Sequence, residues 1–515
     1  MSDSPTLPSQ PPGGIEPTLS PSNTAAPVSP RDSLKSRALR SSSVTLLAYG
    51  FDLVVRLGGN IILSWLLARD AFGLLSVVTA INGVILMFLD VGLQPNVVAA
   101  DREDSRFMNT VWTIQVLQSI LFFLLTVIAA YPLSLMYDQP ELAYLIPAIA
   151  LANFVFGFRS NASLLVGRQL RVGRQAVYRG MSRILATEAM ILWALIWPSV
   201  WALVAGAVTF SLTRMLLSFS LLPGHRVWFD WDKDAARSIF NFGGWLWLNS
   251  AVAGVSRAAD RMLLPVLIGA NWTSMLGVYH FGLMACQIPL EVMRMQMQQV
   301  LFPVLAETRR VSEERLNYQV QRALGIIFPL IMFAMYSVMV IAPVFFTFAL
   351  SEQYREGAAI TQLLIIPAWF ELVYTSGSAV QMALRDSKRL FFGSVLRIIV
   401  LFFGTIICYK LFEFYGFIAA LAIGQIAALV WVNILVARNG VHMMVPHIIY
   451  SAIFMAFVVI GHGIEHYAVF DLHERLAVLA KASVHLPVIA ALAVWALIQV
   501  KKRVGSRKPV AKSAS

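Results

Sequence analysis

The amino-acid sequence predicts an all-α polytopic membrane protein with about fourteen transmembrane helices, and three observations support this fold class. Hydrophobic residues make up 58% of the chain and charged residues only 13%, whereas soluble domains carry about 25% charged residues. Apolar runs of about 20 residues, the length that crosses a bilayer as a helix, recur from Val44 onward. Basic residues gather on one side of these runs. A soluble protein is therefore excluded, and the net charge of +12 indicates membrane orientation rather than a nucleic-acid partner.

Short polar segments separate the apolar runs, so each run is predicted to be one helix. The hardest division lies at Trp197-Pro198, where a stretch of about two span lengths is interpreted as two helices joined by a tight turn. The predicted spans are 44–67, 73–93, 111–133, 143–165, 179–197, 200–222, 240–265, 276–301, 323–349, 358–382, 391–409, 415–437, 447–469 and 481–500.

The distribution of Lys and Arg predicts how these spans are oriented. With a cytoplasmic N-terminus, most of the 40 basic residues fall in cytoplasmic segments or inside spans. The opposite side holds only Arg69, Arg355, Lys410, Arg475 and Lys481. This bias is the one that the positive-inside rule predicts for fourteen spans with both termini in the cytoplasm.

The two ends of the chain are predicted to be cytoplasmic tails. Residues 1–40 begin with a Pro- and Ser-rich stretch that lacks the apolar core of a signal peptide, so we expect this tail to be disordered. Residues 501–515 form a short basic tail. The two cysteines, Cys286 and Cys408, lie in or beside apolar runs, which indicates packing residues rather than a disulfide framework or a metal site.

Charged residues inside the spans predict an internal cavity. A charge near the bilayer centre costs about 2.5–3.5 kcal/mol, so such residues face a protein interior or a wet space rather than lipid. Span 240–265 carries Arg257, Asp260 and Arg261, and span 276–301 carries Glu291 and Arg294. Acidic and basic residues three or four positions apart share a helix face. This spacing predicts pairs between Arg257 and Asp260 and between Glu291 and Arg294.

The first and seventh spans look alike, which suggests an internal repeat. WLLARDAFGLLSVV joins the first span to the second, and VLIGANWTSMLGVY joins the seventh to the eighth. In both stretches a small polar turn precedes Phe-Gly or Leu-Gly and another apolar run. Asp52 and Arg56, four residues apart in the first span, form a further predicted pair. Paired repeats around a site near the membrane midplane are a common transporter design.

Several motifs between about Ser41 and Arg310 resemble the polysaccharide and oligosaccharide flippases of the multidrug/oligosaccharidyl-lipid/polysaccharide exporter superfamily. They are LLARDAFGLLSVV, DVGLQPNVV, WALVAG, ADRMLLPVLIG, LGVYHFG and VLFPVLAE. The resemblance implies two six-helix lobes around a central cavity and two extra C-terminal helices. The corresponding domain boundaries are a lobe at 41–222, a cytoplasmic linker at 223–239, a lobe at 240–437 and the extra helices at 438–500.

The resemblance also implies a function and partners. The expected substrate is an undecaprenyl-diphosphate-linked oligosaccharide that moves across the bacterial inner membrane, from the cytoplasmic to the periplasmic leaflet, for surface polysaccharide biosynthesis. Membrane lipids and the polysaccharide polymerase and export machinery are the other expected partners. No catalytic residue, cofactor or metal is expected, and Asp260 stands where the family commonly has an acidic residue.

The interior charges give the candidate site residues. Planar guanidinium groups bind phosphates with bidentate, charge-assisted hydrogen bonds, so arginines are the candidates for the diphosphate and sugar. They are Arg56, Arg257, Arg261, Arg294 and Arg397. The candidates for ion coupling or for pairing are Asp52, Asp260, Glu291 and Glu371. Glu371 has no basic neighbour in the sequence, so we expect it to be protonated in an apolar setting.

The interior arginines also have a structural interpretation, and two other functional classes are open. Five arginines lie in the cytoplasmic halves of their spans, and snorkelling to the interface is the structural alternative for them. They are Arg159, Arg183, Arg214, Arg294 and Arg397. A multidrug-type antiporter is the second functional class, which the deep arginines disfavour. A membrane polymerase or glycosyltransferase is the third, which the short external loops disfavour. No phosphate-binding loop for ATP is evident, so an ion gradient or the membrane potential is the expected energy source.

Overall fold

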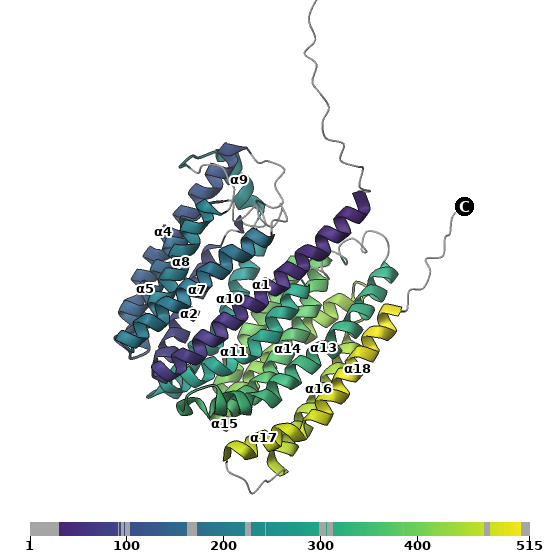
Figure 1. Ribbon diagram of the computed structural model, residues 1–515. Coiled ribbons are helices and arrows are strands. Elements are labelled where there is room, and N and C mark those ends of the chain that lie inside the picture. Colours follow the sequence, from purple (N-terminus) through teal and green to yellow (C-terminus); the bar gives the residue numbers. More distant parts are fainter. Residues whose placement is uncertain are drawn as a thin grey trace, which may run out of the picture.

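The computed structural model consists of long α-helices (Figure 1). It describes residues 30–90, 92–93, 97, 104–161, 172–221, 228–242, 244–297, 305, 313–384, 386–467 and 474–505. In these ranges there is no β-strand. The predicted all-α fold class is confirmed.

The helices follow one another along the chain with short connections. The first six spans correspond to α1 (Pro30–Leu66), α2 (Arg69–Leu89), α4 (Ser105–Met136), α5 (Leu142–Gly157), α7 (Val172–Ile196) and α8 (Trp201–Ser220). The next six correspond to α10 (Gly244–Ile268), α11 (Trp272–Gln296), α13 (Glu313–Phe348), α14 (Gly357–Ala383) and α15 (Ser387–Ala437), of which α15 contains two spans. The C-terminal pair is α16 (Met444–Tyr467) and α18 (Leu486–Gly505), and the short elements are α9 (Lys233–Phe242), α17 (Glu474–Val484) and the 3-10 helix η2 (Glu352–Tyr354).

Two of the span divisions have a clear local cause. The backbone of α15 leaves helical geometry at Phe412 and Glu413, and Glu413 has a φ of 51°. This kink separates the two predicted spans that share α15. At the other uncertain division, α7 ends at Ile196 and α8 begins at Trp201, so the turn at Trp197-Pro198 is confirmed. In the described part of the chain, nine helical stretches are long and apolar enough to cross a membrane by themselves.

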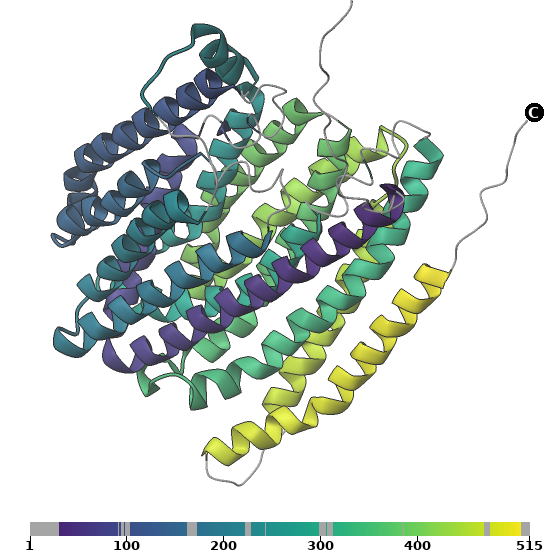
Figure 2. The ribbon, with the colours of Figure 1, turned by 45° about the horizontal axis from the view of Figure 1, so that its top comes forward.

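The helices form two lobes. In the first lobe α4 packs on α5, α7 on α8 and on α1, and α5 on α8. In the second, α14 packs on α11, α13 and α15, and α10 packs on α15. The lobes meet where α2 packs against both α10 and α11. Figure 2 shows the first lobe and the second side by side, with the yellow C-terminal helices along one outer edge. Those helices pack on α13.

The predicted internal repeat lies at the contact between the lobes. A Cβ atom at Gly73 of α2 would overlap the carbonyl oxygen of Thr273, and a Cβ atom at Gly277 of α11 would overlap the carbonyl oxygen of Arg69. The two contacts are therefore reciprocal. At the same end of the molecule the hydroxyl of Thr273 donates to Asp70 Oδ1 at 2.7 Å. The repeated Phe-Gly and Leu-Gly pairs are thus the points at which α2 and α11 approach most closely.

The side chain of Gln353 adds a further connection at this end. Gln353 precedes α14, and its Nε2 donates to the carbonyl oxygen of Leu67 at 3.0 Å and to that of Ser64 at 3.2 Å. The Ser64 carbonyl belongs to the last turn of α1, where carbonyls lack partners within the helix, and Leu67 directly follows that turn. The lobes are consequently joined at the end that carries the α1–α2 and α13–α14 connections.

The domain boundaries stay a prediction, although parts of them can be located. Residues 1–29 and 506–515, which contain most of the predicted tails, lie outside the described residues. Helix α1 begins at Pro30 and so extends into the segment that was predicted as tail. The predicted linker contains most of α9, whose Ala235, Ala236 and Ile239 are buried in a small apolar cluster with α4 residues.

Candidate substrate-binding cavity

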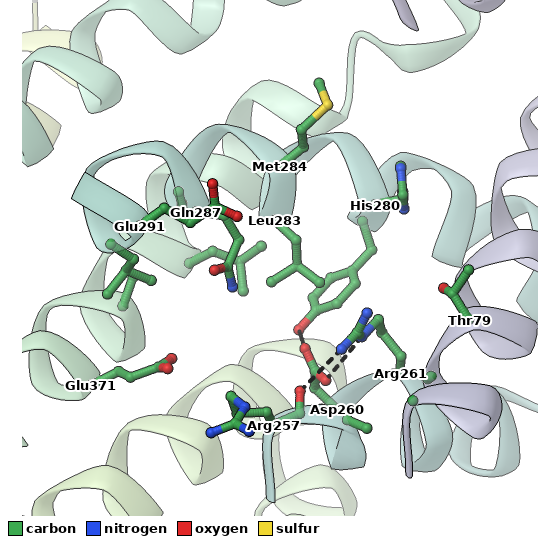
Figure 3. Close-up of a pocket in the computed structure, with 18 of the residues that line it drawn as sticks. Thr79, Arg257, Asp260, Arg261, His280, Leu283, Met284, Gln287, Glu291 and Glu371 are labelled. Atoms are coloured by element: carbon green, nitrogen blue, oxygen red, sulfur yellow. Dashed lines mark hydrogen bonds and ion pairs between the residues drawn. The ribbon is translucent and has the colours of Figure 1, made fainter. Parts of the chain in front are cut away.

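A cavity of about 550 Å³ lies between the two lobes. Its walls come from α1, α2 and α7 of the first lobe and from α10, α11, α14 and α15 of the second. Figure 3 shows side chains from α10 and α11 converging on it, with Arg257, Asp260 and Arg261 on one wall and Glu371 on another. The cavity thus draws on both halves of the predicted repeat.

The candidate residues from the sequence meet in this cavity. Eight of the nine line it: Arg56, Arg257, Asp260, Arg261, Glu291, Arg294, Glu371 and Arg397. The ninth, Asp52, forms an ion pair with Arg183, which is itself a lining residue. The positions of these residues therefore agree with the expectation of an internal cavity, whereas the roles assigned to them remain a prediction.

On α10 Asp260 is held by Arg261 and not by Arg257. Asp260 Oδ1 lies 3.6 Å from Arg261 Nε, and Asp260 Oδ2 accepts a hydrogen bond of 2.9 Å from the hydroxyl of Tyr279 on α11 (Figure 3). Arg257 instead donates to Met87 Sδ on α2 at 3.3 Å. The predicted pair between Arg257 and Asp260 is wrong, because Asp260 is held by its neighbour and by α11.

The other predicted pairs are also replaced by pairs between helices. Arg56 of α1 lies 3.7 Å from Glu291 of α11, whose Oε2 also accepts a hydrogen bond of 2.8 Å from Tyr49. Asp52 of α1 pairs with Arg183 of α7 at 2.8 Å. The predicted pair of Asp52 with Arg56 is therefore wrong.

Glu371 likewise finds its partner on another helix. Arg294 of α11 forms an ion pair with Glu371 of α14, and its other amine group donates to Gln287 Oε1 at 3.4 Å. The predicted pair of Glu291 with Arg294 is therefore wrong. The expectation of a protonated Glu371 rested on the lack of a nearby cation in the sequence, and Arg294 supplies that cation in the fold.

The cavity lining carries more positive than negative groups. It contains six arginines, Arg56, Arg183, Arg257, Arg261, Arg294 and Arg397, and three carboxylates, Asp260, Glu291 and Glu371. Within the described part of the chain, no ion pair joins a carboxylate to Arg257 or to Arg397. Arg397 is only 7% exposed and its guanidinium lies 5.9 Å from the centre of the Tyr374 ring. These two cations of the lining thus form no direct ion pair among the described residues, although both interact electrostatically with Glu371.

Sequence reasoning missed several lining or contacting residues. Arg183 was interpreted as a shallow arginine, yet it lines the cavity and neutralises Asp52. Tyr49 and Tyr279, the hydroxyl donors to Glu291 and Asp260, had no sequence signal because their acceptors lie on other helices. Tyr279 does stand in the LGVYHFG motif, one residue before the lining residue His280. That motif was the signal that pointed to this wall.

The five shallow arginines divide into two groups. Arg183, Arg294 and Arg397 line the cavity rather than extending to the interface. Arg159 and Arg214 lie elsewhere, against aromatic rings inside the first lobe: both are near the ring of Phe156, at 4.0 and 4.3 Å from its centre. For Arg183, Arg294 and Arg397 the cavity position argues against snorkelling, whereas for Arg159 and Arg214 snorkelling stays an open alternative.

Comparison with known proteins agrees with this architecture. The model of a family described as polysaccharide biosynthesis protein matches residues 62–360. The teichuronic acid biosynthesis protein TuaB of Bacillus subtilis (strain 168) is 19% identical over 356 residues, which cover 68% of this chain and 69% of TuaB. The succinoglycan biosynthesis transport protein ExoT of Rhizobium meliloti (strain 1021) is 24% identical over 257 residues, which cover 49% of this chain and 51% of ExoT.

Solved structures share the fold. The lipid II flippase MurJ in an inward closed conformation matches with a TM-score of 0.65 at 12% identity, over 88% of this chain and 99% of that one. An inward-facing multidrug resistance MATE family transporter of the MOP superfamily matches with a TM-score of 0.60 at 13% identity, over 76% of this chain and 95% of that one. The apolar helices define a multi-pass membrane protein, and its fold is similar to that of this flippase and this transporter. The chain belongs to the family of polysaccharide biosynthesis proteins, because the family model covers more than half of it.

Proposed function

We propose that this protein flips an undecaprenyl-diphosphate-linked oligosaccharide from the cytoplasmic to the periplasmic leaflet of a bacterial inner membrane, for surface polysaccharide biosynthesis. The observation that carries the proposal is the excess of arginine over carboxylate in the cavity between the lobes. In this arrangement both termini lie in the cytoplasm, as the distribution of Lys and Arg predicts.

A diphosphate suits the unpaired cations of the lining. Arg257 and Arg397 come from different helices of the second lobe and have no ion pair with a carboxylate among the described residues. A guanidinium in a space of low dielectric is stabilised by an anion with oxygens in a planar or tetrahedral array, to which it donates two parallel hydrogen bonds. The diphosphate supplies such oxygens, while its sugar finds amide partners at Gln287 and Gln425 of the same lining.

The paired charges fit a role in conformational change or ion coupling. Arg56 and Glu291 belong to different lobes, so a movement of one lobe relative to the other would lengthen their 3.7 Å contact. We propose an ion gradient or the membrane potential as the energy source. A membrane potential acts on a net charge that moves across the bilayer, and the anionic diphosphate is such a charge.

The antiporter class is the second candidate, and the fold of the MATE transporters is compatible with it. An organic cation would enter a cavity whose lining holds six arginines and three carboxylates. Repulsion between like charges in a poorly solvated space disfavours that substrate. The anionic lipid-linked glycan is therefore the better match to the charge of the cavity.

Two arginine variants on one helix provide the test. Arg397→Ala removes a cation that lines the cavity, and Arg389→Ala removes an exposed cation of the same helix, α15, that pairs with Asp386. We expect Arg397→Ala to abolish or strongly reduce polymer export at a normal protein level, and Arg389→Ala to leave export unchanged. Arg257→Ala should act like Arg397→Ala, and Arg257→Lys should restore export only in part because a point charge replaces a planar fork.

A structural role for the α10 cluster makes a different forecast. If Asp260 and Arg261 only stabilise each other, each single alanine variant lowers the protein level and the double variant Asp260→Ala/Arg261→Ala restores it. Protein level and export are therefore both measured in all three variants, and normal export by the double variant would leave this pair as structure. Normal export by Arg257→Ala or by Arg397→Ala would contradict the proposed substrate role of these two arginines.

A further inference from the structure

A second cluster of arginines lies in the first lobe, at the end opposite to the α1–α2 connection. It consists of alternating arginine and aromatic side chains: Arg183, Phe210, Arg214, Phe156 and Arg159, here named the arginine ladder. Phe156 and Arg159 lie at and just after the end of α5, Arg183 lies in the first half of α7, and Phe210 and Arg214 lie in the middle and the second half of α8. All three segments lie at the end of the lobe that the charge distribution predicts to be cytoplasmic.

Each step of the ladder is a cation–π contact. Arg183 lies 4.4 Å from the centre of the Phe210 ring, and Arg214 lies 5.3 Å from that ring and 4.3 Å from the ring of Phe156. Arg159 lies 4.0 Å from the ring of Phe156. These distances fall within the range of about 6 Å over which a guanidinium is attracted to an aromatic face. The ladder therefore connects the cavity wall at Arg183 with the interior of the first lobe.

Charge is balanced only at one end of the ladder. Arg183 is neutralised by Asp52 at 2.8 Å. For Arg159 and Arg214, no ion pair with a carboxylate occurs in the part of the chain that the structure describes. Arg159 donates to the carbonyl oxygen of Phe156 at 3.1 Å, and the buried Nε of Arg214 has no hydrogen-bond partner among the described residues. Arg159 and Arg214 thus both lie against the Phe156 ring, and the Nε–H of Arg214 has no acceptor among the described residues.

The ladder is held on rigid backbone. Gln115 of α4 donates through its Nε2 to the carbonyl oxygens of Gly157 at 2.6 Å and Arg159 at 3.1 Å, which fixes the last turn of α5. The backbone N–H of Ser160 donates to the hydroxyl of Ser218, on α8, at 2.9 Å. One hydrogen bond therefore joins the end of α5 to α8, and two join it to α4, so the backbone beside the two guanidiniums is held from both sides.

We propose that Arg159 and Arg214 bind the phosphate headgroup of an anionic phospholipid, at a site separate from the central cavity. Basic pockets between transmembrane helices on the cytoplasmic side are suited to anionic headgroups. The helices that carry the ladder also expose large apolar side chains, among them Val177, Leu212 and Leu216, so acyl chains border this part of the lobe. A lipid phosphate brings negative charge to the two arginines while its tails stay in the bilayer.

The lipid site and the cavity are physically connected through the ladder. Phe210 lies between Arg214 and Arg183, and Arg183 lines the cavity. An anion at Arg214 relieves the repulsion with Arg159 and holds Arg214 against both rings. The headgroup would in this way hold the wall of the cavity formed by α7 in place.

Lipid retention by the purified full-length protein tests the proposal. The protein is delipidated in detergent and titrated with phosphatidylglycerol or with zwitterionic phosphatidylcholine, and bound lipid is counted by native mass spectrometry. We expect preferential binding of phosphatidylglycerol, and binding at least tenfold weaker in the variant Arg159→Gln/Arg214→Gln. Arg174→Gln, which removes an exposed arginine of α7 outside the ladder, should change binding by less than twofold.

Further arms separate the alternatives. Arg159→Gln alone should weaken phosphatidylglycerol binding severalfold, which keeps the test valid if the double variant fails to fold. Equal binding by wild type and Arg159→Gln/Arg214→Gln would overturn the site and leave the ladder as internal packing. Thermal stabilisation by inorganic phosphate without retention of phosphatidylglycerol would overturn the lipid assignment in favour of a soluble phosphate.

Discussion

Gly73 of α2 lies against the main-chain carbonyl oxygen of Thr273, so closely that a Cβ atom does not fit between them. Gly277 of α11 has the same relationship to Arg69. Gly73 and Gly277 hold equivalent positions of the internal repeat, and so do their contact residues Arg69 and Thr273. The two contacts bring α2 and α11 together at one end of the cavity. A methyl group at either glycine therefore has to push the two lobes apart.

Gly73→Ala and Gly277→Ala are expected to lower the thermal stability of the purified protein. Overpacking costs about 1–3 kcal/mol, which exceeds the gain of about 1 kcal/mol that alanine brings to a helix interior. Unfolding in detergent, followed by fluorescence or calorimetry, measures the change. The control is Gly58→Ala in α1, where a new Cβ meets nothing within 4 Å. A Gly73→Ala variant as stable as Gly58→Ala would show that the two helices do not approach so closely.

Removing one member of the Arg294–Glu371 pair should destabilise the protein more than removing both. The side chains are 30% and 16% exposed, so removal of one leaves the other as a largely buried charge without its counter-ion. Breaking a buried pair costs about 3–5 kcal/mol, and we expect about 1–3 kcal/mol here because both side chains are partly exposed. Arg294→Met/Glu371→Leu should recover most of the loss, as judged by midpoints of thermal unfolding. Additive losses in this double variant would instead indicate that each residue has its own separate partner.

Cysteine accessibility should show on which side of the membrane each connection lies. In a variant in which Cys286 and Cys408 are replaced by alanine, Asn271→Cys should react with a membrane-impermeant maleimide in whole spheroplasts. Lys388→Cys should react only after permeabilisation. Both positions are exposed at helix starts, Asn271 before α11 and Lys388 in the first turn of α15. Labelling of Lys388→Cys in intact spheroplasts would refute the fourteen-span orientation.

Eight of the nine candidate residues line the cavity, but most of the contacts predicted between them are absent. Charges inside apolar runs have few environments open to them, so their presence already indicated an inward-facing location. The ion-pair partners of these charges could not be predicted in the same way. Glu291 was expected to pair with Arg294 on its own helix, but it pairs with Arg56 of α1, and Arg294 pairs with Glu371 of α14. Helical spacing shows on which face of its helix a residue lies, but not which residues of other helices pack against that face.

The sequence by itself determined the all-α class, the order of the spans and the stretches that form the repeat. Length and hydropathy decide these properties, because a bilayer accepts only backbone whose hydrogen bonds are satisfied within the segment. Only the tertiary structure decided that Arg257 and Arg397 form no direct ion pair among the described residues, and that Arg159 and Arg214 share one aromatic ring. Such relationships arise when helices far apart in the chain pack together, and no local pattern of residues encodes the distance between them.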